Sequence, residues 1–171
     1  KGPFVESLPD GEKGASLAEL VAEGTLHPGW AAMAKSPNSR KIYERSLHLH
    51  QAATIGLDEN YLVATGTGSG KTESFLFPLV DTLLRDPDLK RPGVRAILVY
   101  PLNSLVNDQM HRIARLLFAD LGDQGITLGR YTGQVRSNET RQEVQNQLLD
   151  TPTFQANFPE AQSVPKNWLL S

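Results

Sequence analysis

Cysteine is absent from this sequence of 171 residues, which excludes disulfide bonds and thiolate metal sites. No apolar run approaches the roughly 20 residues that a membrane-spanning helix needs, and no secretory signal is visible. Neither sign of charge dominates, because 17 lysines and arginines stand beside 19 aspartates and glutamates. Since a near-neutral chain gives no general support to nucleic-acid binding, any basic groove has to be local. The composition is that of an ordinary soluble protein, and the lack of cysteine fits the cytoplasm.

The sequence is organised around a glycine-rich stretch, Ala64-Thr65-Gly66-Thr67-Gly68-Ser69-Gly70-Lys71-Thr72. An apolar run at 61–64 precedes it, and a segment with helical periodicity follows it. A strand, a glycine-rich turn and a helix in this order form the context of a phosphate-binding loop. The pattern G-x-x-x-x-G-K-[ST] has Thr65 at its first position instead of glycine, but the three glycines within the loop supply the freedom at positive φ. A plain Gly/Ser turn with an incidental Lys-Thr is the weaker alternative.

In such a loop, backbone N–H groups and the positive end of the following helix hold an anion. The pattern assigns Lys71 to the β- and γ-phosphates of a nucleotide and the Thr72 hydroxyl to Mg²⁺. The following helix carries an apolar stripe and contains Pro78, which removes one helical hydrogen bond; the stripe consists of Leu76, Leu79, Val80, Leu83 and Leu84.

Before the loop, a short helix over 16–23 is predicted, with Ser16 and Glu19 forming a capping box and Gly24 ending it. A helical turn or two should follow up to residue 35, then a loop at 37–39, then a helix from about 40 to 57. We expect no metal site at His48 and His50, because a spacing of two points them to different helix faces and zinc needs three or four ligands. The amide of Gln51 can donate and accept at once, as reading an adenine edge requires. A solvated helix glutamine is the simpler alternative.

After the loop, the pattern alternates between strands and helices. The run 95–100 predicts a buried strand, and 126–131 a further one. A helix between them should be capped by Asn103 or Ser104, with Arg112 and Arg115 turned outward. A polar helix is expected over 137–149 and an irregular connection from 151 onward. This order predicts an α/β fold with a mostly parallel sheet. Ligands would bind at the carboxyl edge of that sheet, where the loop and the turns at 100–104 and 131–133 meet.

These pieces resemble the first RecA-like domain of a superfamily 2 DEAD/DEAH-box helicase. Leu49-His50-Gln51 looks like the end of the Q-motif region, and 64–73 looks like motif I. Residues 100–109 look like motif Ia in the form found in large bacterial helicases with a DUF1998-type region, often from phage-defence or DNA-repair systems. Residues 129–133 match the turn before motif Ib, and 164–171 resemble the segment just ahead of motif Ib and the DEAH box.

The resemblance implies a partial RecA-like domain at 40–171 that binds ATP and Mg²⁺, preceded by an N-terminal arm with accessory helices at 1–39. Lys71 and Thr72 would be catalytic, with Thr72 on Mg²⁺. The implied nucleotide-binding residues are Gln51, Thr67, Gly68, Ser69, Gly70, Lys71, Thr72 and Glu73. The implied nucleic-acid contacts are Pro101, Leu102, Asn103, Ser104, Thr132 and Gly133. For Asn103 and Ser104, plain helix capping is the alternative to a phosphate contact.

The sequence departs from the family in the residues that drive ATP hydrolysis. No Asp-Glu-x-[His/Asp] stands anywhere in it, so the carboxylates that complete the Mg²⁺ site and orient the attacking water are missing. We therefore expect this stretch to bind ATP weakly without hydrolysing it, and the chain to be part of a larger DNA helicase or translocase. A nucleotide-gated scaffold subunit and a P-loop kinase are the other hypotheses.

Overall fold

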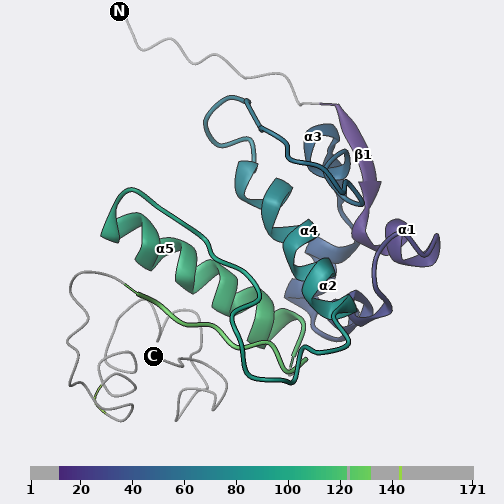
Figure 1. Cartoon of the computed structure of the whole chain (residues 1–171). Helices are drawn as coiled ribbons and strands as arrows, with labels where there is room; N and C mark the ends of the chain where they lie inside the picture. Colours follow the sequence, from purple (N-terminus) through teal and green to yellow (C-terminus); the bar gives the residue numbers. More distant parts are fainter. Residues whose placement is uncertain (1–11, 123, 132–142, 144–171) are drawn as a thin grey trace, which may run out of the picture.

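The structure is a computed structural model that describes residues 12–122, 124–131 and 143 (Figure 1). The described part of the chain contains two short strands and a set of helices. The elements are β1 (Lys13–Ser16), α1 (Leu17–Ala22), the 3₁₀ helix η1 (Pro28–Lys35), α2 (Pro37–Glu44), β2 (Ser46–His48), α3 (Leu49–Ala52), α4 (Lys71–Arg85), α5 (Asn103–Ala114) and the π-helix η2 (Arg115–Asp120). The predicted helix over 137–149 and the tail from 151 lie outside the described residues.

The helix α1 begins as predicted. The Ser16 hydroxyl accepts a hydrogen bond from the Glu19 amide at 3.2 Å, and the Glu19 carboxylate accepts one from the Ser16 amide at 2.7 Å. Both orphan donors at the helix start are thereby satisfied. The amide and the hydroxyl of Ser16 both donate to the Glu19 carboxylate, and these two bonds lower the pKa of Glu19, the backbone bond most strongly. The 3₁₀ helix η1 confirms the predicted helical turns before residue 36.

The single helix predicted over about 40–57 is wrong. The chain instead forms α2, β2 and α3, and Pro37 lies at the first position of α2 rather than in a loop. Residues of β2 pair antiparallel with β1, His48 opposite Lys13 and Ser46 opposite Ser16. This pairing across some thirty residues competes with helix formation, and the local pattern carried no trace of it. It also changes the relation of His48 to His50, whose rings stack at 5.6 Å and 10° instead of pointing apart.

One hydrophobic core joins the N-terminal elements to the helices after the loop. Trp30, on η1, is fully buried and meets the ring of Phe77 on α4 edge to face at 5.5 Å. The core also includes Leu17, Leu20, Leu26, Met33, Tyr43, Leu47, Leu76, Val80, Ile113, Leu116, Leu117, Leu121 and Ile126. Residues before and after position 40 therefore pack together, and Trp30 and Tyr43 serve the core.

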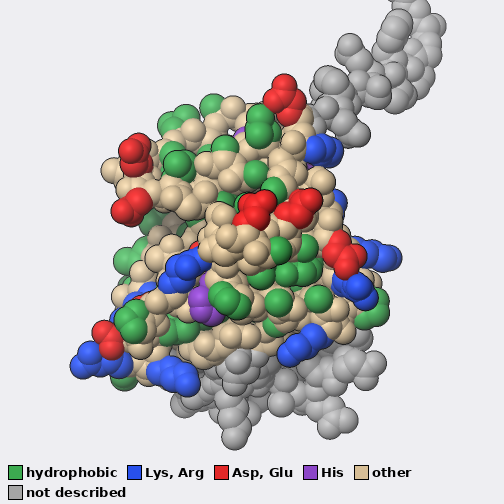
Figure 2. All heavy atoms as spheres, turned by 90° about the vertical axis from the view of Figure 1, so that its right-hand side faces the viewer, with side chains coloured by type: hydrophobic (Ala, Val, Ile, Leu, Met, Phe, Trp, Pro, Cys, Tyr) green, Lys and Arg blue, Asp and Glu red, His purple; other side chains and the backbone are tan. Residues whose placement is uncertain are grey.

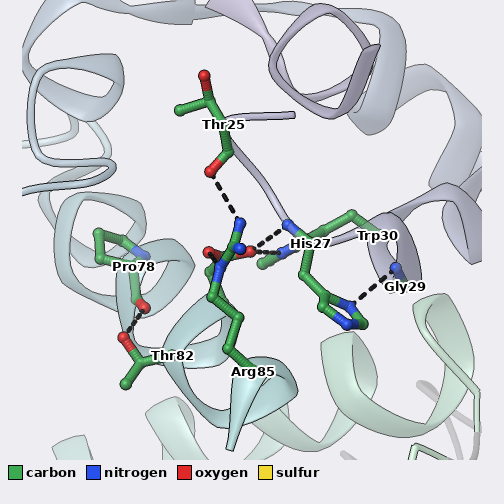
Figure 3. A network of polar contacts seen from close by, with 8 residues as sticks. Thr25, His27, Gly29, Trp30, Pro78, Thr82 and Arg85 are labelled. Carbon is green, nitrogen blue, oxygen red and sulfur yellow. Dashed lines mark hydrogen bonds and ion pairs between the residues drawn. The ribbon is translucent and has the colours of Figure 1, made fainter. Parts of the chain in front are cut away.

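A buried carboxylate on α4 forms hydrogen bonds with the N-terminal segment that contains His27 and Trp30 (Figure 3). Asp81 Oδ1 accepts a hydrogen bond from the His27 amide at 2.6 Å and one from Trp30 Nε1 at 3.1 Å. Its Oδ2 accepts from Arg85 Nε at 2.7 Å, and Arg85 in turn donates to the Thr25 carbonyl at 3.0 Å. The helix that starts at the glycine-rich loop is thus tied by hydrogen bonds to the segment before η1.

The parallel sheet does not appear in the described part of the chain, where the one sheet recorded is the pair β1–β2. The segments 61–64 and 95–100 form no strands, and several of their side chains are exposed: Leu62 by 88%, Ile97 by 78% and Val99 by 86%. A segment counts as a strand only when a neighbour completes its hydrogen-bond ladder. In parallel sheets, consecutive strands along the chain need not be neighbours, and these segments do not pair with one another.

A second buried carboxylate, Asp120 on η2, should make the free energy of unfolding depend on pH. The Ser39 hydroxyl donates to it at 2.5 Å, yet burial raises its pKa above the ordinary value of 3.8. An acid whose pKa is raised by folding makes the protein less stable as pH climbs from the unfolded pKa to the folded one. We expect Asp120→Asn, which keeps an acceptor for Ser39, to gain stability relative to wild type as pH rises above about 4. Urea unfolding of both proteins across that range measures the difference, and a constant difference would contradict this account.

Candidate nucleotide-binding site

The glycine-rich loop has the backbone that the pattern requires. Gly68 and Gly70 have φ values of 77° and 78°, in the left-handed region that favours glycine. A side-chain contact between Thr65 Oγ1 and Ser69 Oγ at 2.6 Å closes the loop, and α4 begins at once with Lys71. The helix has Gly70 as its N-cap and no side-chain cap, so its first amides remain open to an anion.

Lys71 is folded back onto its own loop. Its Nζ donates to the carbonyls of Thr65 at 2.8 Å and Gly66 at 2.6 Å. These neutral acceptors hold the ammonium at the loop, where a phosphate, as a charged acceptor, would form the stronger bond. The partners of Lys71 in this structure therefore belong to the loop itself, and its contact with the β- and γ-phosphates stays a prediction.

Gln51 is buried, with 2% of its surface exposed, so the solvated-glutamine alternative is wrong. Its Oε1 accepts from the His48 amide at 2.9 Å, and its Nε2 donates to the Gly70 carbonyl at 3.0 Å. The amide thus connects the start of α3 to the loop. One Nε2 hydrogen and one Oε1 lone pair remain for a ligand, which is the combination that an adenine edge needs.

A cavity of about 400 Å³ opens beside these groups. Three parts of the chain line it: the β2–α3 segment, the loop with the start of α4, and α5. The lining residues are Arg45, His48, Gln51, Gly68, Gly70, Lys71, Thr72, Glu73 and Arg112. Three basic side chains and one histidine therefore surround a space with one carboxylate, a charge pattern that suits a polyphosphate. Thr67 and Ser69 lie in the same loop without lining the cavity.

Sequence reasoning missed Arg45, His48 and Arg112. Arg112 is exposed, as predicted, but its guanidinium also forms an ion pair with Glu73, and its Nη1 lies 3.5 Å from Thr72 Oγ1. Burial raises the pKa of Tyr100 above its ordinary value, and the nearby charge of Arg112 offsets part of that rise. The contact depends on how α4 and α5 pack side by side (Figure 1), which no local pattern records.

The residues present fit Mg²⁺-ATP. Mg²⁺ in nucleotide sites takes one or two protein ligands, with phosphate oxygens and waters completing its octahedron. The Thr72 hydroxyl, which lines the cavity, would supply one ligand, and Lys71 and the first α4 amides would supply donors for the phosphates. Gln51 and His48 also line the cavity.

The segment predicted to contact nucleic acid is exposed where the structure describes it. Pro101, Leu102, Asn103 and Ser104 all lie on the surface. The predicted capping by Asn103 or Ser104 is wrong, because α5 has Leu102 as its N-cap and no side-chain cap. The helix starts one residue earlier than the polar pattern implied, and this leaves its first amides open to an anion. Thr132 and Gly133 lie outside the described residues.

The face of the molecule that carries β1 and α1 has mixed charge. Figure 2 views the molecule from the side of β1 and α1, and there acidic and basic side chains are interspersed. They do not gather into one basic patch on this face.

Gly70 is the loop position most sensitive to a side chain. A Cβ there would lie 2.3 Å from Gln51 Nε2 and 3.1 Å from Glu73 Oε2, and φ is already in the left-handed region. We expect Gly70→Ala to displace Gln51 and to weaken ATP binding at least tenfold. Isothermal titration of both proteins with ATP and Mg²⁺ checks this. Gly56→Ala is the control, because Gly56 has a similar φ of 80° but nothing within 4 Å of its Cβ. Equal losses in the two variants would contradict a site-specific role.

Comparison with known proteins gives consistent results. The chain is 35% identical over 172 aligned residues to Druantia protein DruE of Escherichia coli, covering 90% of this chain and 9% of the relative. It is 42% identical over 73 residues to ATP-dependent rRNA helicase spb4 of Sclerotinia sclerotiorum, covering 40% of this chain and 12% of the relative. It is 29% identical over 114 residues to the uncharacterized ATP-dependent helicase MJ1574 of Methanocaldococcus jannaschii, covering 62% and 16%.

The chain thus spans between about a tenth and a sixth of the length of these curated relatives. No solved structure gives a significant match. None of the helices in the described part has both the length and the hydrophobicity to cross a membrane. The family model for DEAD/DEAH box helicases matches residues 48–158, which include the loop, Gln51 and α5 and make up more than half of the chain. The chain therefore belongs to the DEAD/DEAH box helicase family, whose RecA-like fold is of the α/β class.

Proposed function

We propose that the natural full-length protein is a nucleic-acid-dependent ATPase, a helicase or translocase that uses ATP to move along a DNA strand. The observation that carries the proposal is the cavity between the glycine-rich loop and α5. One wall of this cavity holds Lys71 and Thr72, and the other holds Arg112. The helix that carries Arg112 begins in the exposed segment 101–104. The proposed nucleotide site and the candidate segment for binding a nucleic-acid strand therefore both include α5.

In the proposed site, bound Mg²⁺-ATP supplies the transferable phosphoryl group. Lys71 leaves the Thr65 and Gly66 carbonyls and stabilises charge on the β- and γ-phosphates. The amides of Gly68 to Lys71 hold the phosphates, Thr72 holds the metal, and Gln51 selects adenine. No Asp-Glu-x-[His/Asp] stands in this sequence, so the residue that orients the attacking water is not among these residues. We expect this stretch alone to bind ATP without turning it over.

The strand would lie against the start of α5. The open amides there suit a phosphate, and Asn103 and Ser104 add small polar groups. The remaining proposed contacts with the nucleic-acid backbone are Pro101, Leu102, Thr132 and Gly133. Such contacts follow the backbone of the strand and do not depend on its base sequence.

DNA is proposed over RNA on the resemblance of the motif Ia segment at 100–109 to large bacterial helicases of phage-defence and DNA-repair systems, although relatives named rRNA helicase spb4 match up to 60% of this chain. We further propose a large bacterial helicase of the DUF1998-associated type, cytoplasmic, working with other subunits of a phage-defence or repair complex. Residues 1–39 would be an accessory region and 40–171 part of the ATPase domain.

The test is the ATP turnover rate of the natural full-length protein without nucleic acid, with single-stranded DNA and with RNA of the same sequence. The proposal predicts stimulation by DNA beyond that by RNA. Stimulation by RNA alone would support a nucleic-acid-dependent motor that moves along RNA instead of DNA. Indifference to both would overturn the proposal and favour the nucleotide-gated scaffold or the P-loop kinase.

A further inference from the structure

Arg112 connects the two proposed sites. Its guanidinium contacts Glu73 and lies 3.5 Å from the Thr72 hydroxyl, both in the first turn of α4. The helix that carries it begins at Asn103. With a rise of 1.5 Å per residue, the two positions are only about 13 Å apart along the helix axis. A single rigid element thus reaches from the metal-binding residue to the proposed strand contact.

We expect Arg112 to move when Mg²⁺ and a nucleotide bind at Thr72. A Mg²⁺ ion bound to the Thr72 hydroxyl would lie about 2.1 Å from that oxygen. It would therefore stand within about 6 Å of the nearest Arg112 nitrogen, and the two positive groups would repel each other. Arg112 must then withdraw from Thr72 or turn toward a phosphate oxygen. Either movement changes its contact with Glu73.

Glu73 can accommodate a second arrangement. One of its carboxylate oxygens already binds Arg112, while Oε2 is buried and makes no hydrogen bond to the residues that the structure describes. Arginine commonly binds a carboxylate through both oxygens. The free oxygen thus offers Arg112 a place to go when it leaves Thr72.

We propose that Arg112 is a positioning residue whose ion pair with Glu73 couples nucleotide loading at Thr72 to the placement of α5, and hence to the affinity for the nucleic-acid strand. The inference rests on the proposed function. It is a claim about linkage: if nucleotide changes strand affinity by some factor, the strand changes nucleotide affinity by the same factor. Removing the guanidinium should reduce that factor towards one without abolishing either binding event.

The experiment measures strand affinity rather than turnover. A fluorescent single-stranded DNA is titrated with the natural full-length protein, with and without Mg²⁺ and a non-hydrolysable ATP analogue. Wild type should show a coupling factor in the range of about 5 to 150. We expect Arg112→Gln to bring it below about 2, Glu73→Gln to do the same, and Arg112→Lys to keep part of it. Arg115→Gln is the matched control, since Arg115 is an exposed arginine of the same helical segment, and it should leave the factor unchanged.

The outcomes separate the two claims. If wild type shows coupling and both Arg112→Gln and Glu73→Gln retain it, the inference is overturned while the proposed function stands. If wild type binds neither single-stranded DNA nor RNA, the proposed function fails and the inference fails with it. Wild-type binding without any effect of nucleotide would overturn the inference alone. Circular dichroism of each variant checks that the protein is still folded. Because Arg112→Gln and Glu73→Gln change opposite partners of one ion pair, the same loss of coupling in both would point to that ion pair.

Discussion

Replacing Lys71 with alanine should lower ATP turnover by the natural full-length protein by a factor of 100 or more. The ammonium is the one side-chain cation of the loop, and in phosphoryl transfer such a group stabilises charge that develops on the phosphates. Removing one preorganised donor at a reacting centre typically costs about 100- to 1000-fold in rate. A coupled assay that follows ADP release under saturating ATP measures the loss.

Lys41→Ala is the matched control for this substitution. Lys41 lies exposed on α2 and does not line the cavity. Its replacement should leave turnover within about twofold. If Lys71→Ala retained most of the wild-type rate, the loop would not be the hydrolytic site, whatever else it binds.

The second large effect concerns stability. We expect Asp81→Ala to lower the free energy of unfolding by about 2–4 kcal/mol, because it removes a charged acceptor and leaves buried donors unpaired. Those donors are the His27 amide and Trp30 Nε1, and Arg85 would lose its ion partner as well. Urea denaturation of this 171-residue chain measures the change.

Asp88→Ala serves as the comparison for Asp81→Ala. The Asp88 side chain is 55% exposed and pairs with Arg91 at the surface, so its loss should cost at most about 1 kcal/mol. Equal effects of the two substitutions would mean that the contacts of Asp81 with the N-terminal segment do not stabilise the fold.

The local signals in the sequence were sufficient for several elements. The capping box at Ser16, the glycine-rich loop, and the helices α4 and α5 all depend on residues within one or two turns of each other. Pro78 lies inside α4 as expected, and the Thr82 hydroxyl donates to its carbonyl at 2.9 Å. The family resemblance, carried by the loop and the motif Ia segment, is confirmed by the family match.

What the sequence did not reveal depends on contacts between distant segments. The pairing of β1 with β2 replaced part of a predicted helix, and Arg112 reached Glu73 across 39 positions. The sequence made Gln51 a candidate for nucleotide binding, which stays a prediction, but it did not reveal the hydrogen bond from Gln51 to the Gly70 carbonyl, 19 positions away. The segments 61–64 and 95–100 have strand-like composition, yet a strand needs a neighbour to pair with. Composition alone says nothing about where that neighbour lies.

The most direct test of the central claim compares the ATP turnover of wild type and Lys71→Ala, each with and without single-stranded DNA. The account predicts a wild-type rate that rises severalfold with DNA and a variant rate that stays near background in both conditions. A wild-type rate that ignores nucleic acid, or a variant that DNA still stimulates, would contradict it.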